Sequence, residues 1–153
     1  MAATADSIFQ NKTGDFRLTA HQTLLPAGWD RPRGYANGMA AHGRLVFTAG
    51  IVGWDERQRF VSEDMVGQFE QVLVNTVAIL AEAGARPEHI VRMTWYVTDR
   101  AEYVNNLAEI GQIYKKFIGK VFPAMTVVEV TALVEASARI EIETTAVLPD
   151  PVS

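Results

Sequence analysis

The chain has 153 residues, 48% of them apolar, and no Cys, so it fits one globular domain that needs neither disulfides nor a structural metal. The absence of Cys excludes thiolate nucleophiles, Cys-ligated zinc and iron–sulfur clusters. A net charge of −4, without a run of like charges, gives no electrostatic reason to expect nucleic acid or an anionic membrane as partner.

Residues 1–33 are predicted to form an N-terminal arm or an edge element. They mix polar residues with Pro26, Gly28 and Pro32, and only a weak strand signal runs from Phe16 to Thr23. The start of the chain lacks the apolar core of a secretory signal, and no apolar stretch reaches the roughly 18 to 20 residues of a membrane span. The sequence therefore predicts a cytoplasmic protein without a membrane segment.

A β-hairpin is the next predicted element. The extended run Tyr35–Ala41 is followed by a turn at His42-Gly43-Arg44 and by the apolar run Leu45–Ala49, which is the pattern of two strands joined by a short turn. A loop is predicted over residues 53–60.

An amphipathic helix is predicted over residues 64–83, because apolar or small side chains recur there at helical spacing. They are Met65, Phe69, Val72, Leu73, Thr76, Leu80 and Ala83. Gly84 is typical of a helix end. The segment Ile90–Thr98 is rich in β-branched and aromatic residues, which predicts a strand.

A second helix is predicted from Asp99 to Gly119. Glu102 stands three positions after Asp99, and this spacing indicates a capping box. The predicted buried stripe consists of Tyr103, Leu107, Ile110, Tyr114 and Phe117. Two further strands are predicted over Ala124–Val130 and Ala138–Leu148.

The predicted order is hairpin, helix, strand, helix, strand, strand, an α+β domain over residues 34–148 with two helices on one face of a sheet. Residues 149–153 form a tail. Residues 124–130 carry apolar side chains on both alternating faces, and residues 45–49 do the same. Because two helices cover only one face, a homo-oligomer with cyclic closure is the economical cover for the other. The alternative is that Val and Thr are simply good strand formers.

The residue types of metal and nucleotide chemistry are sparse. His21, His42 and His89 stand far apart, without a carboxylate at ligand spacing, so no metal site is predicted and no cofactor is expected. The glycine-rich phosphate loops and the serine nucleophile elbow are absent.

Two carboxylates in the last strand are the remaining candidates for chemistry. Alternation places Glu141 and Glu143 opposite two isoleucines, and a carboxylate on that face can serve as general acid or base if an oligomer covers it. The alternative is an acidic face that meets water or pairs with Arg139.

Several short segments, in this order, resemble the Rid family, the reactive-intermediate (enamine and imine) deaminases also called YjgF-type or L-PSP proteins. They are Gly34-Tyr35-Ala36-Asn37-Gly38, Leu45-Val46-Phe47-Thr48-Ala49-Gly50, Ala83-Gly84, Ile90-Val91 with Tyr96-Val97-Thr98-Asp99, Phe122-Pro123-Ala124-Met125-Thr126, and Ile140-Glu141-Ile142-Glu143. The resemblance implies a chorismate-mutase-like ββαβαββ fold and a homotrimer with small-molecule sites in the clefts between subunits. This agrees with the strands that are apolar on both faces.

The resemblance also implies a mechanism and a set of site residues. A water molecule held by a backbone carbonyl and a carboxylate attacks the imine carbon, and ammonia leaves. By position, the carboxylate is that of Glu141, the carbonyl is that of Val127, and Tyr35 closes the pocket. The other substrate-binding positions are Thr48, Ala49, Gly50, Gly111, Met125 and Thr126.

Three positions depart from the family pattern. The family's Pro-Ala-Arg-Ser stretch, whose Arg binds the substrate carboxylate, has Met125 in place of the Arg, and a Ser and an Asn of the pattern correspond to Ala49 and Gly111. A thioether supplies neither the charge nor the bidentate geometry of a guanidinium. The sequence therefore predicts no useful hydrolysis of 2-aminoacrylate and related amino-acid-derived imines, and a cleft suited to a flat or uncharged ligand.

Three functions remain open. The first is hydrolysis of another enamine, imine or labile intermediate, with Glu141 as general acid and base. The second is a non-catalytic trimer that binds a small metabolite or a protein partner, for which Trp54 lines a cleft or anchors a loop, while Trp95 is predicted to be core. The third, endoribonuclease activity after the family's older label, is remote because the basic residues are scattered. These residues are Arg31, Arg33, Arg57, Arg59, Lys115, Lys116 and Lys120.

Overall fold

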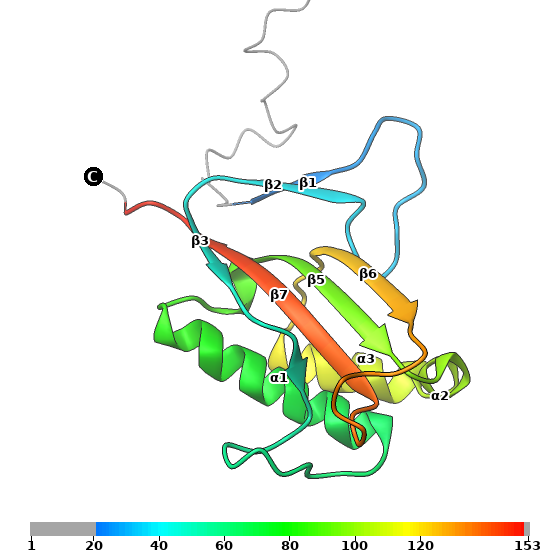
Figure 1. Cartoon of the computed structure of the whole chain (residues 1–153). Coiled ribbons are helices and arrows are strands. Elements are labelled where there is room, and N and C mark those ends of the chain that lie inside the picture. Colours follow the sequence, from blue (N-terminus) through cyan, green and yellow to red (C-terminus); the bar gives the residue numbers. More distant parts are fainter. Residues whose placement is uncertain (1–20, 152–153) are drawn as a thin grey trace, which may run out of the picture.

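The computed structural model describes residues 21–151, and its centre is a five-stranded mixed sheet (Figure 1). The strands are β3 (Arg44–Phe47), β4 (Ile51–Val52), β5 (Ile90–Val97), β6 (Ala124–Glu129) and β7 (Ile140–Leu148). Their order is β3-β7-β5-β6, and β4 also pairs with β7. Only β5 and β6 run parallel; the other pairs are antiparallel. The predicted α+β fold is confirmed.

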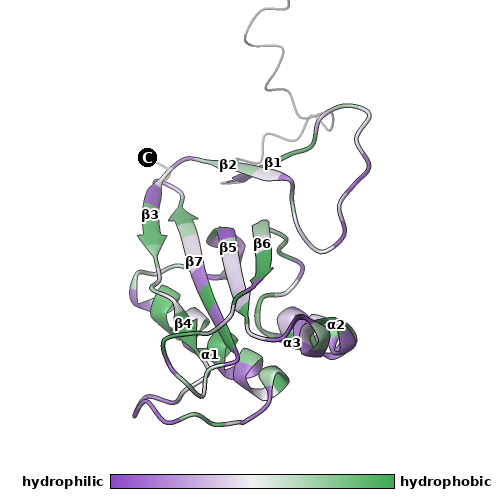
Figure 2. Ribbon diagram, turned by 45° about the vertical axis from the view of Figure 1, so that its right-hand side comes forward, coloured by the Kyte–Doolittle hydropathy of each residue, from purple (hydrophilic) through white to green (hydrophobic). Residues whose placement is uncertain are grey.

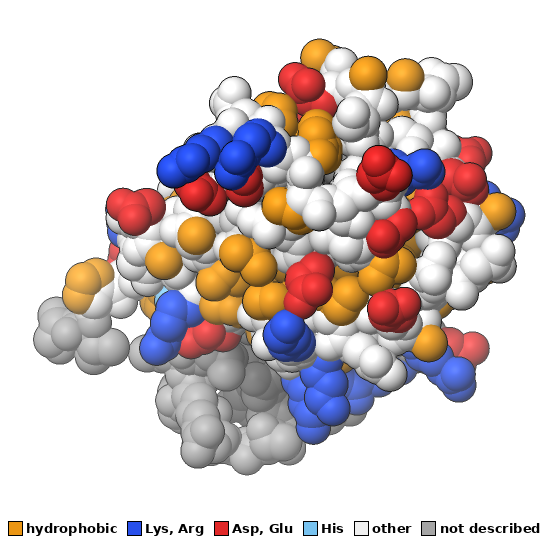
Figure 3. All heavy atoms as spheres, turned by 90° about the horizontal axis from the view of Figure 1, so that it is seen from below, with side chains coloured by type: hydrophobic (Ala, Val, Ile, Leu, Met, Phe, Trp, Pro, Cys, Tyr) orange, Lys and Arg blue, Asp and Glu red, His pale blue; other side chains and the backbone are white. Residues whose placement is uncertain are grey.

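The helices α1 (Met65–Glu82), α2 (Arg100–Asn105) and α3 (Leu107–Phe117) lie on one face of this sheet (Figure 1). A single turn of 3-10 helix, η2 (Pro87–His89), leads into β5. Seen from the helical side, acidic and basic side chains surround the apolar ones (Figure 3). Of the described helices, none has the length and apolar character needed to cross a membrane.

The core lies between α1 and the sheet. Phe69 and Leu73 of α1 are fully buried against Met93 of β5 and Ile140 and Ile142 of β7. Asp64 caps α1 by accepting a hydrogen bond of 2.8 Å from the backbone N–H of Gly67, as expected for an N-cap aspartate. This bond, with one from the Ser62 hydroxyl, lowers the pKa of the Asp64 carboxyl.

The second predicted helix is in fact two helices, because helical geometry is interrupted at Asn106. The side-chain amide of Asn106 donates a 2.7 Å hydrogen bond to the backbone carbonyl of Glu102, and Asn106 leaves helical geometry with φ −111° and ψ 14°. An Asn side chain that bonds the backbone in this way competes with the helical ladder. The single helix from Asp99 to Gly119 was a wrong prediction.

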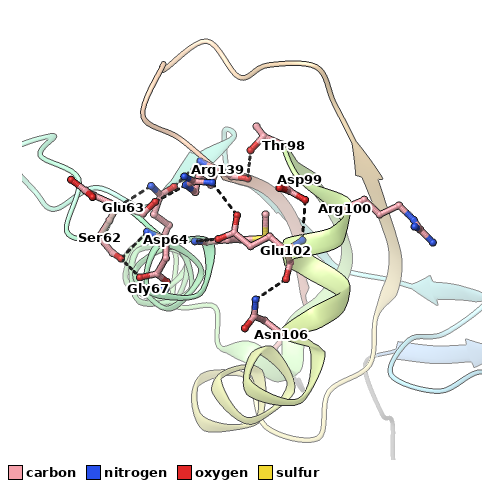
Figure 4. Close-up of polar contacts among 12 residues, drawn as sticks. Ser62, Glu63, Asp64, Gly67, Thr98, Asp99, Arg100, Glu102, Asn106 and Arg139 are labelled. Atoms are coloured by element: carbon pink, nitrogen blue, oxygen red, sulfur yellow. Dashed lines mark hydrogen bonds and ion pairs between the residues drawn. The ribbon is translucent and has the colours of Figure 1, made fainter.

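The capping box at Asp99 is only half formed. Asp99 accepts from the backbone N–H of Glu102 at 2.9 Å, but the Glu102 carboxylate turns elsewhere (Figure 4). It accepts a 2.8 Å hydrogen bond from the N–H of Met65 at the start of α1 and forms a 3.0 Å ion pair with Arg139 beside β7. Glu102 therefore joins α2 to α1 and to the last strand.

The predicted hairpin of residues 35–49 is wrong in its pairing. Strand β2 (Gly38–Ala41) pairs with β1 (His21–Leu24), whereas β3 pairs with β7. The reason lies at Gly43, whose φ of +142° and close approach to the Leu148 carbonyl turn the chain onto the edge of β7. The β1–β2 pair lies beyond one end of the sheet (Figure 2). Part of the weak strand signal, residues 16–20, lies outside the described residues.

The sheet face opposite the helices carries uncovered apolar side chains in the single chain. Leu45 and Phe47 of β3 are 58% and 66% exposed, while Val46 between them packs against the core. Val128 of β6 is 40% exposed. Figure 2 shows the hydrophobic colouring of β3 and β6. The prediction of strands that are apolar on both faces is confirmed.

Candidate functional site

A cleft of about 850 Å³ lies between α3 and the edge strand β6. This volume lies within the usual range of small-molecule pockets. One stripe of α3 forms a wall of the cleft, with side chains spaced by three or four positions. The stripe consists of Leu107, Ile110, Gly111, Tyr114 and Lys115. Leu107, predicted to be buried, is 48% exposed because it faces the cleft.

Strand β6 contributes Met125 and Val127 to the opposite wall. They stand beside Met93 and Trp95 of β5 in the parallel register, and both of those neighbours are buried on the helical side. The side chains of Met125 and Val127 therefore point to the same side of the sheet as the helices.

Aromatic rings form much of the cleft floor. Trp95 lies with its ring centroid 6.4 Å from that of Tyr103 and 6.1 Å from that of Tyr114, and it is 3% exposed, which confirms it as core. Tyr114 donates a 2.7 Å hydrogen bond to the Val121 carbonyl, and burial raises the pKa of its phenol. The floor is therefore mostly apolar: the Tyr114 hydroxyl is already bonded, while the buried Nε1–H of Trp95 has no hydrogen-bond partner among the described residues.

The mouth of the cleft is cationic. Arg33, Lys115 and Lys120 are exposed lining residues, and no Asp or Glu of residues 21–151 lines the cleft. Lys115 ends the α3 stripe, and Gly119, with φ +79°, turns the chain so that Lys120 also faces the cleft. Within the described part of the chain, none of the three cations forms an ion pair.

The sequence pattern indicated that these three cations are scattered, so it did not predict that they meet at the mouth of the cleft. A signal was present for two of them, because Lys115 stands four positions after Gly111 on the helix, and Lys120 directly follows Gly119, which is a helix-ending residue. Nothing in the sequence pattern linked Arg33 to them.

Glu141 lies on the other side of the sheet. It pairs in register with Val52 of β4 and with Tyr96 of β5. Because Ile140 and Ile142 are fully buried against the helices, alternation directs the half-buried Glu141 toward the open face. A Cβ atom on residue 50 would overlap Oε1 of Glu141, so the carboxylate lies directly against the backbone of Gly50.

The carboxylate of Glu141 has no hydrogen-bond partner among residues 21–151. Its neighbour Glu143 does: the Tyr96 hydroxyl donates to Glu143 at 3.1 Å. That bond, with burial, raises the pKa of the Tyr96 phenol. Among the described residues, Glu143 thus has a hydrogen-bond partner and Glu141 has none.

The hydroxyl of Thr48 fixes the backbone next to Glu141 through two hydrogen bonds. It accepts a 3.0 Å hydrogen bond from the N–H of Thr144 and donates at 2.8 Å to the carbonyl of Ala49. These bonds hold the connection between β3 and β4 against β7 and leave Gly50 beside Glu141. The side chain of Thr126 is exposed on β6 next to Thr94 in register, on the open face.

Apart from Thr126 on the open face of β6, the predicted site residues therefore fall into two groups. The cleft on the helical side collects Tyr35, Gly111, Met125 and Val127. The segment from Thr48 to Gly50 lies with Glu141 at β7. Within one described chain the two groups do not meet, so a site that uses both needs residues from a second copy.

Other candidate groups have structural roles. Trp54 packs on Phe60 with ring centroids 5.9 Å apart, and its carbonyl accepts from the Asn75 amide at 2.8 Å, so it anchors its loop. His89 accepts from the backbone N–H of Arg86 at 3.0 Å. Among the residues that the structure describes, no group of three or more His, Asp or Glu side chains is placed to hold a metal ion.

A second hollow, of about 840 Å³, borders Arg139. The guanidinium of Arg139 pairs with Glu102 at 3.0 Å and donates to the Glu63 carbonyl (Figure 4). The backbone N–H of Arg139 donates to Gln68 at 2.7 Å. Arg139 holds the start of β7 in place.

Residues 30–148 match the model of the protein family described as Endoribonuclease L-PSP. A 2-iminobutanoate/2-iminopropanoate deaminase of Salmonella typhimurium is 35% identical over 108 residues, which are 69% of this chain and 80% of that protein.

Solved structures agree. A Rid-family protein of unknown function from Yersinia pestis, YyfB, has a TM-score of 0.76 at 32% identity, over 84% of this chain and 99% of that one. The YjgF gene product of E. coli has a TM-score of 0.59 at 32% identity, over 74% and 87% of the two chains. Because the family model spans most of the chain and the fold agrees, the chain belongs to the Rid family, also called the YjgF or L-PSP family.

Proposed function

We propose that the chain hydrolyses an imine or enamine in clefts formed between the subunits of a homotrimer. The observation that carries this proposal is the position of the Glu141 carboxylate, which has no partner among the described residues and is held against Gly50 on one side of the sheet, while the cleft of Met125 and Val127 opens on the other. The Salmonella relative, a deaminase of two small imino acids by its name, supports the reaction class.

The uncovered apolar face supports the assembly. The side of the sheet to which Glu141 points exposes Leu45, Phe47 and Val128. Contact of such apolar side chains with water is unfavourable, so burying them in an interface stabilises the assembly. Cyclic packing of three copies covers this face in each copy and repeats one heterologous contact. It brings Glu141 of one subunit to the cleft of its neighbour.

The chemistry follows from a positioned water molecule. Val127 lies on an edge strand that pairs only with β5 in the main sheet, so its backbone offers a carbonyl group at the cleft. Glu141 takes a proton from the water as the water oxygen bonds to the carbon of the protonated imine, giving a neutral carbinolamine. The carboxyl group then returns that proton to nitrogen, and the resulting carboxylate takes up the hydroxyl proton as the C–N bond breaks, so that ammonia leaves and the carbonyl forms. An enamine first accepts a proton at carbon to become the imine.

Recognition of the substrate differs from that of typical family members. Met125 stands where the resemblance places a carboxylate-binding Arg, and Gly111 stands where it places an Asn. A substrate carboxylate seated against Met125 would lose its hydration without gaining a counter-charge, which costs several kcal/mol. We therefore exclude 2-aminoacrylate and similarly small imino acids as the principal substrates.

The test of catalysis is the ammonia released from a panel of imines and enamines generated in the assay. Glu141→Gln keeps the shape of the side chain but cannot accept the proton, and we expect its rate to fall at least about a hundredfold. Glu143→Gln is the matched control, two positions along the same strand, and should keep most of the activity. Light scattering should give the same trimer mass for all three proteins. Equal rates for Glu141→Gln and wild type would overturn the catalytic role.

Met125→Arg tests the recognition argument in the same assay. The guanidinium restores a bidentate partner for a carboxylate, so the release of ammonia from the imine of pyruvate should rise at least about tenfold. A wild-type rate on that imine equal to the rate of the Salmonella relative would contradict the exclusion.

A non-catalytic trimer that binds a small metabolite is the second candidate. The loss of the Arg and the Asn at Met125 and Gly111 favours it, because both residues belong to the family's substrate contacts. A ligand that saturates the cleft and is recovered unchanged, with no ammonia released from any member of the panel, would support it.

Nuclease activity, the word in the description of the family model, finds little support in the surface charge. Ion pairs already engage Arg59, Arg86, Lys116 and Arg139, and the net charge is −4. A concentrated basic surface is the usual footprint of RNA binding.

A further inference from the structure

We propose that the cleft takes the imine or enamine of a phosphorylated ketone or aldehyde, with the phosphate several bonds away from the reacting carbon. The phosphate lies between Arg33, Lys115 and Lys120, and the reacting carbon, which carries no carboxylate, lies beside Val127. This inference rests on the proposed function and names its substrate class. Addition of water and cleavage of the C–N bond release ammonia and leave the phosphorylated ketone or aldehyde.

The cleft borders the outer edge of β6, which faces away from β5. Just before this strand the Pro123 carbonyl accepts a 2.9 Å hydrogen bond from the N–H of Ala36, which lies outside the main sheet. Just after it, the N–H of Val130 donates to the Val97 carbonyl of β5 at 2.8 Å. Because successive residues direct their N–H and C=O groups to opposite edges of a strand, the Val127 carbonyl lies on the same outer edge as that of Pro123.

Two of the cations lie toward the start of β6, away from Val127. Ala36 pairs with Ala124, the first residue of that strand, and Arg33 comes three residues before Ala36 in the chain. Lys120 comes four residues before Ala124. Val127 lies three residues beyond Ala124, which is about 10 Å along a strand.

The wall formed by α3 is oriented in the same way. Tyr114, near the end of α3, donates a 2.7 Å hydrogen bond to the carbonyl of Val121 in the segment that leads into β6, so Lys115 lies at the same end of the cleft as Lys120. Leu107, at the other end of the α3 stripe, is eight residues from Lys115, which is about 12 Å along a helix. The attacking water and the hydrogen bonds to the cations occupy part of this length. Several bonds therefore separate the phosphate from the reacting carbon.

Apolar side chains surround the position beside Val127, which is unfavourable for a carboxylate. Met125 stands two positions before Val127 on the same face of β6, and Trp95 pairs with Val127 in register. A charge desolvated there gains no counter-charge. In an imino acid the carboxylate is bonded directly to the imine carbon, so it cannot reach the cations about 10 Å away. The imine of a ketone or aldehyde has no such group.

The cations at the mouth suit a phosphate better than a carboxylate. They come from three separate segments, no Asp or Glu of residues 21–151 lines the cleft, and none of the three forms an ion pair with a described residue. A phosphate monoester carries close to two negative charges on three acceptor oxygens, whereas a carboxylate carries one charge on two oxygens. Lys116, the residue after Lys115, already pairs with Glu70 of α1 at 2.7 Å.

Binding of stable ketone products tests the proposal by calorimetry. In 5-oxohexyl phosphate the phosphorus is six bonds from the ketone carbon, and in 2-oxopropyl phosphate it is three bonds away. The compound 6-hydroxy-2-hexanone has the longer chain without the phosphate, and 6-oxoheptanoate carries a carboxylate in its place. We expect 5-oxohexyl phosphate to bind at least about tenfold more tightly than the alcohol at low salt, with most of this advantage lost at high salt.

The other two compounds test the length and the charge of the ligand. The shorter phosphate should bind at least about fivefold more weakly than the longer one, because it cannot reach both ends of the cleft. The carboxylate should bind about threefold more weakly than the longer phosphate, because it has less charge and one oxygen fewer. Equal affinity of the two phosphates would overturn the separation of anion and reacting carbon, and equal affinity of carboxylate and phosphate would overturn the phosphate.

Charge variants test the position of the phosphate. Lys115→Gln and Lys120→Gln should each weaken binding of 5-oxohexyl phosphate about threefold at low salt and leave binding of 6-hydroxy-2-hexanone unchanged. Lys116→Gln is the matched control, with the same change of charge on the same helical turn, and should leave both affinities unchanged. Equal effects of the Lys115 and Lys116 changes would overturn the proposed contact.

The same proteins separate this inference from the proposed function. Salt-dependent binding of 5-oxohexyl phosphate without ammonia release from its imine would leave the ligand class standing and remove catalysis. Ammonia release from other imines, without preferential binding of 5-oxohexyl phosphate, would leave catalysis standing and overturn the ligand class.

Discussion

Gly50 and Gly111 are both placed at the site by the family resemblance, yet their surroundings are opposite. A Cβ on residue 50 would overlap the carboxylate of Glu141, whereas a Cβ on residue 111 meets no described residue within 4 Å. The same substitution should therefore have different effects at the two positions.

Gly50→Ala should push the Glu141 carboxylate away from its position and lower the rate of ammonia release at least about tenfold. The displaced atom is the end of a flexible side chain, so the melting temperature should change little. Gly111→Ala is the comparison: alanine is the better residue in a helix by about 0.5–1 kcal/mol, so the melting temperature should rise by a few degrees. An unchanged rate for Gly50→Ala would show that the carboxylate does not act from this position.

At the residue scale the sequence predicted the direction of Glu141 but not the cationic mouth. Alternation with Ile140 and Ile142 is a local property of one strand, so the pattern alone shows which way the carboxylate points. The mouth depends on two turns with positive φ, at Gly34 and Gly119, which bring Arg33 and Lys120 together with a helix end. Such non-local contacts leave no periodic signal.

Among the elements, α2 is tied to α1 and to the start of β7 through the side chain of Glu102. Glu102 accepts from the N–H of Met65 and pairs with Arg139 (Figure 4), and it lies only 21% exposed. Glu102→Ala removes both partners, so we expect the free energy of unfolding to fall by about 2–3 kcal/mol. Glu109→Ala on the exposed side of α3 is the control and should change it by less than about 0.5 kcal/mol. Urea unfolding measures both, and similar losses for the two variants would contradict this role.

His89 gives a pH dependence at the start of β5. Burial lowers the pKa of its imidazole below the ordinary 6.5, and its Nδ1 accepts from the backbone N–H of Arg86, which a protonated ring cannot do. The unfolded chain takes up the proton first, so stability is fully present above pH 6.5 and falls as the pH drops below it. We expect His89→Gln to flatten the stability profile between about pH 7 and pH 5 relative to wild type. Parallel profiles for the two proteins would contradict the assignment.

The elements themselves show where pattern reasoning succeeds. The helix from Asp64 and the strand from Ile90 were predicted nearly to the residue, because each is a long periodic segment with a cap or a breaker at its end. Pairing of the short strands was not, since β2 and β3 contain four residues each and their partners are chosen by burial of the whole sheet. The interruption at Asn106 depends on a single side-chain hydrogen bond, which has no periodic signal in the sequence.

For the whole molecule, the central expectation is a trimer of three times the 16.9 kDa chain joined through the open face of the sheet. Phe47 is 66% exposed there, and Phe47→Asp places a charge in the proposed contact, where an unpaired charge is costly. We expect this variant to be monomeric in light scattering, with a circular dichroism spectrum like that of wild type. Val134→Asp, at a 97% exposed loop position, should stay trimeric. If Phe47→Asp is still a trimer, the interface between subunits does not include this position.

Complementation between two inactive variants tests most directly whether each site is shared by two copies. Glu141→Gln removes the carboxylate and keeps the cleft, whereas Gly111→Trp fills the cleft and keeps the carboxylate. Each alone should release ammonia at no more than about a hundredth of the wild-type rate. In trimers assembled from equal amounts of both, some sites combine an intact cleft with an intact Glu141, so about a quarter of the wild-type rate should return. Mixed trimers that stay as inactive as their parents would contradict a site shared between subunits.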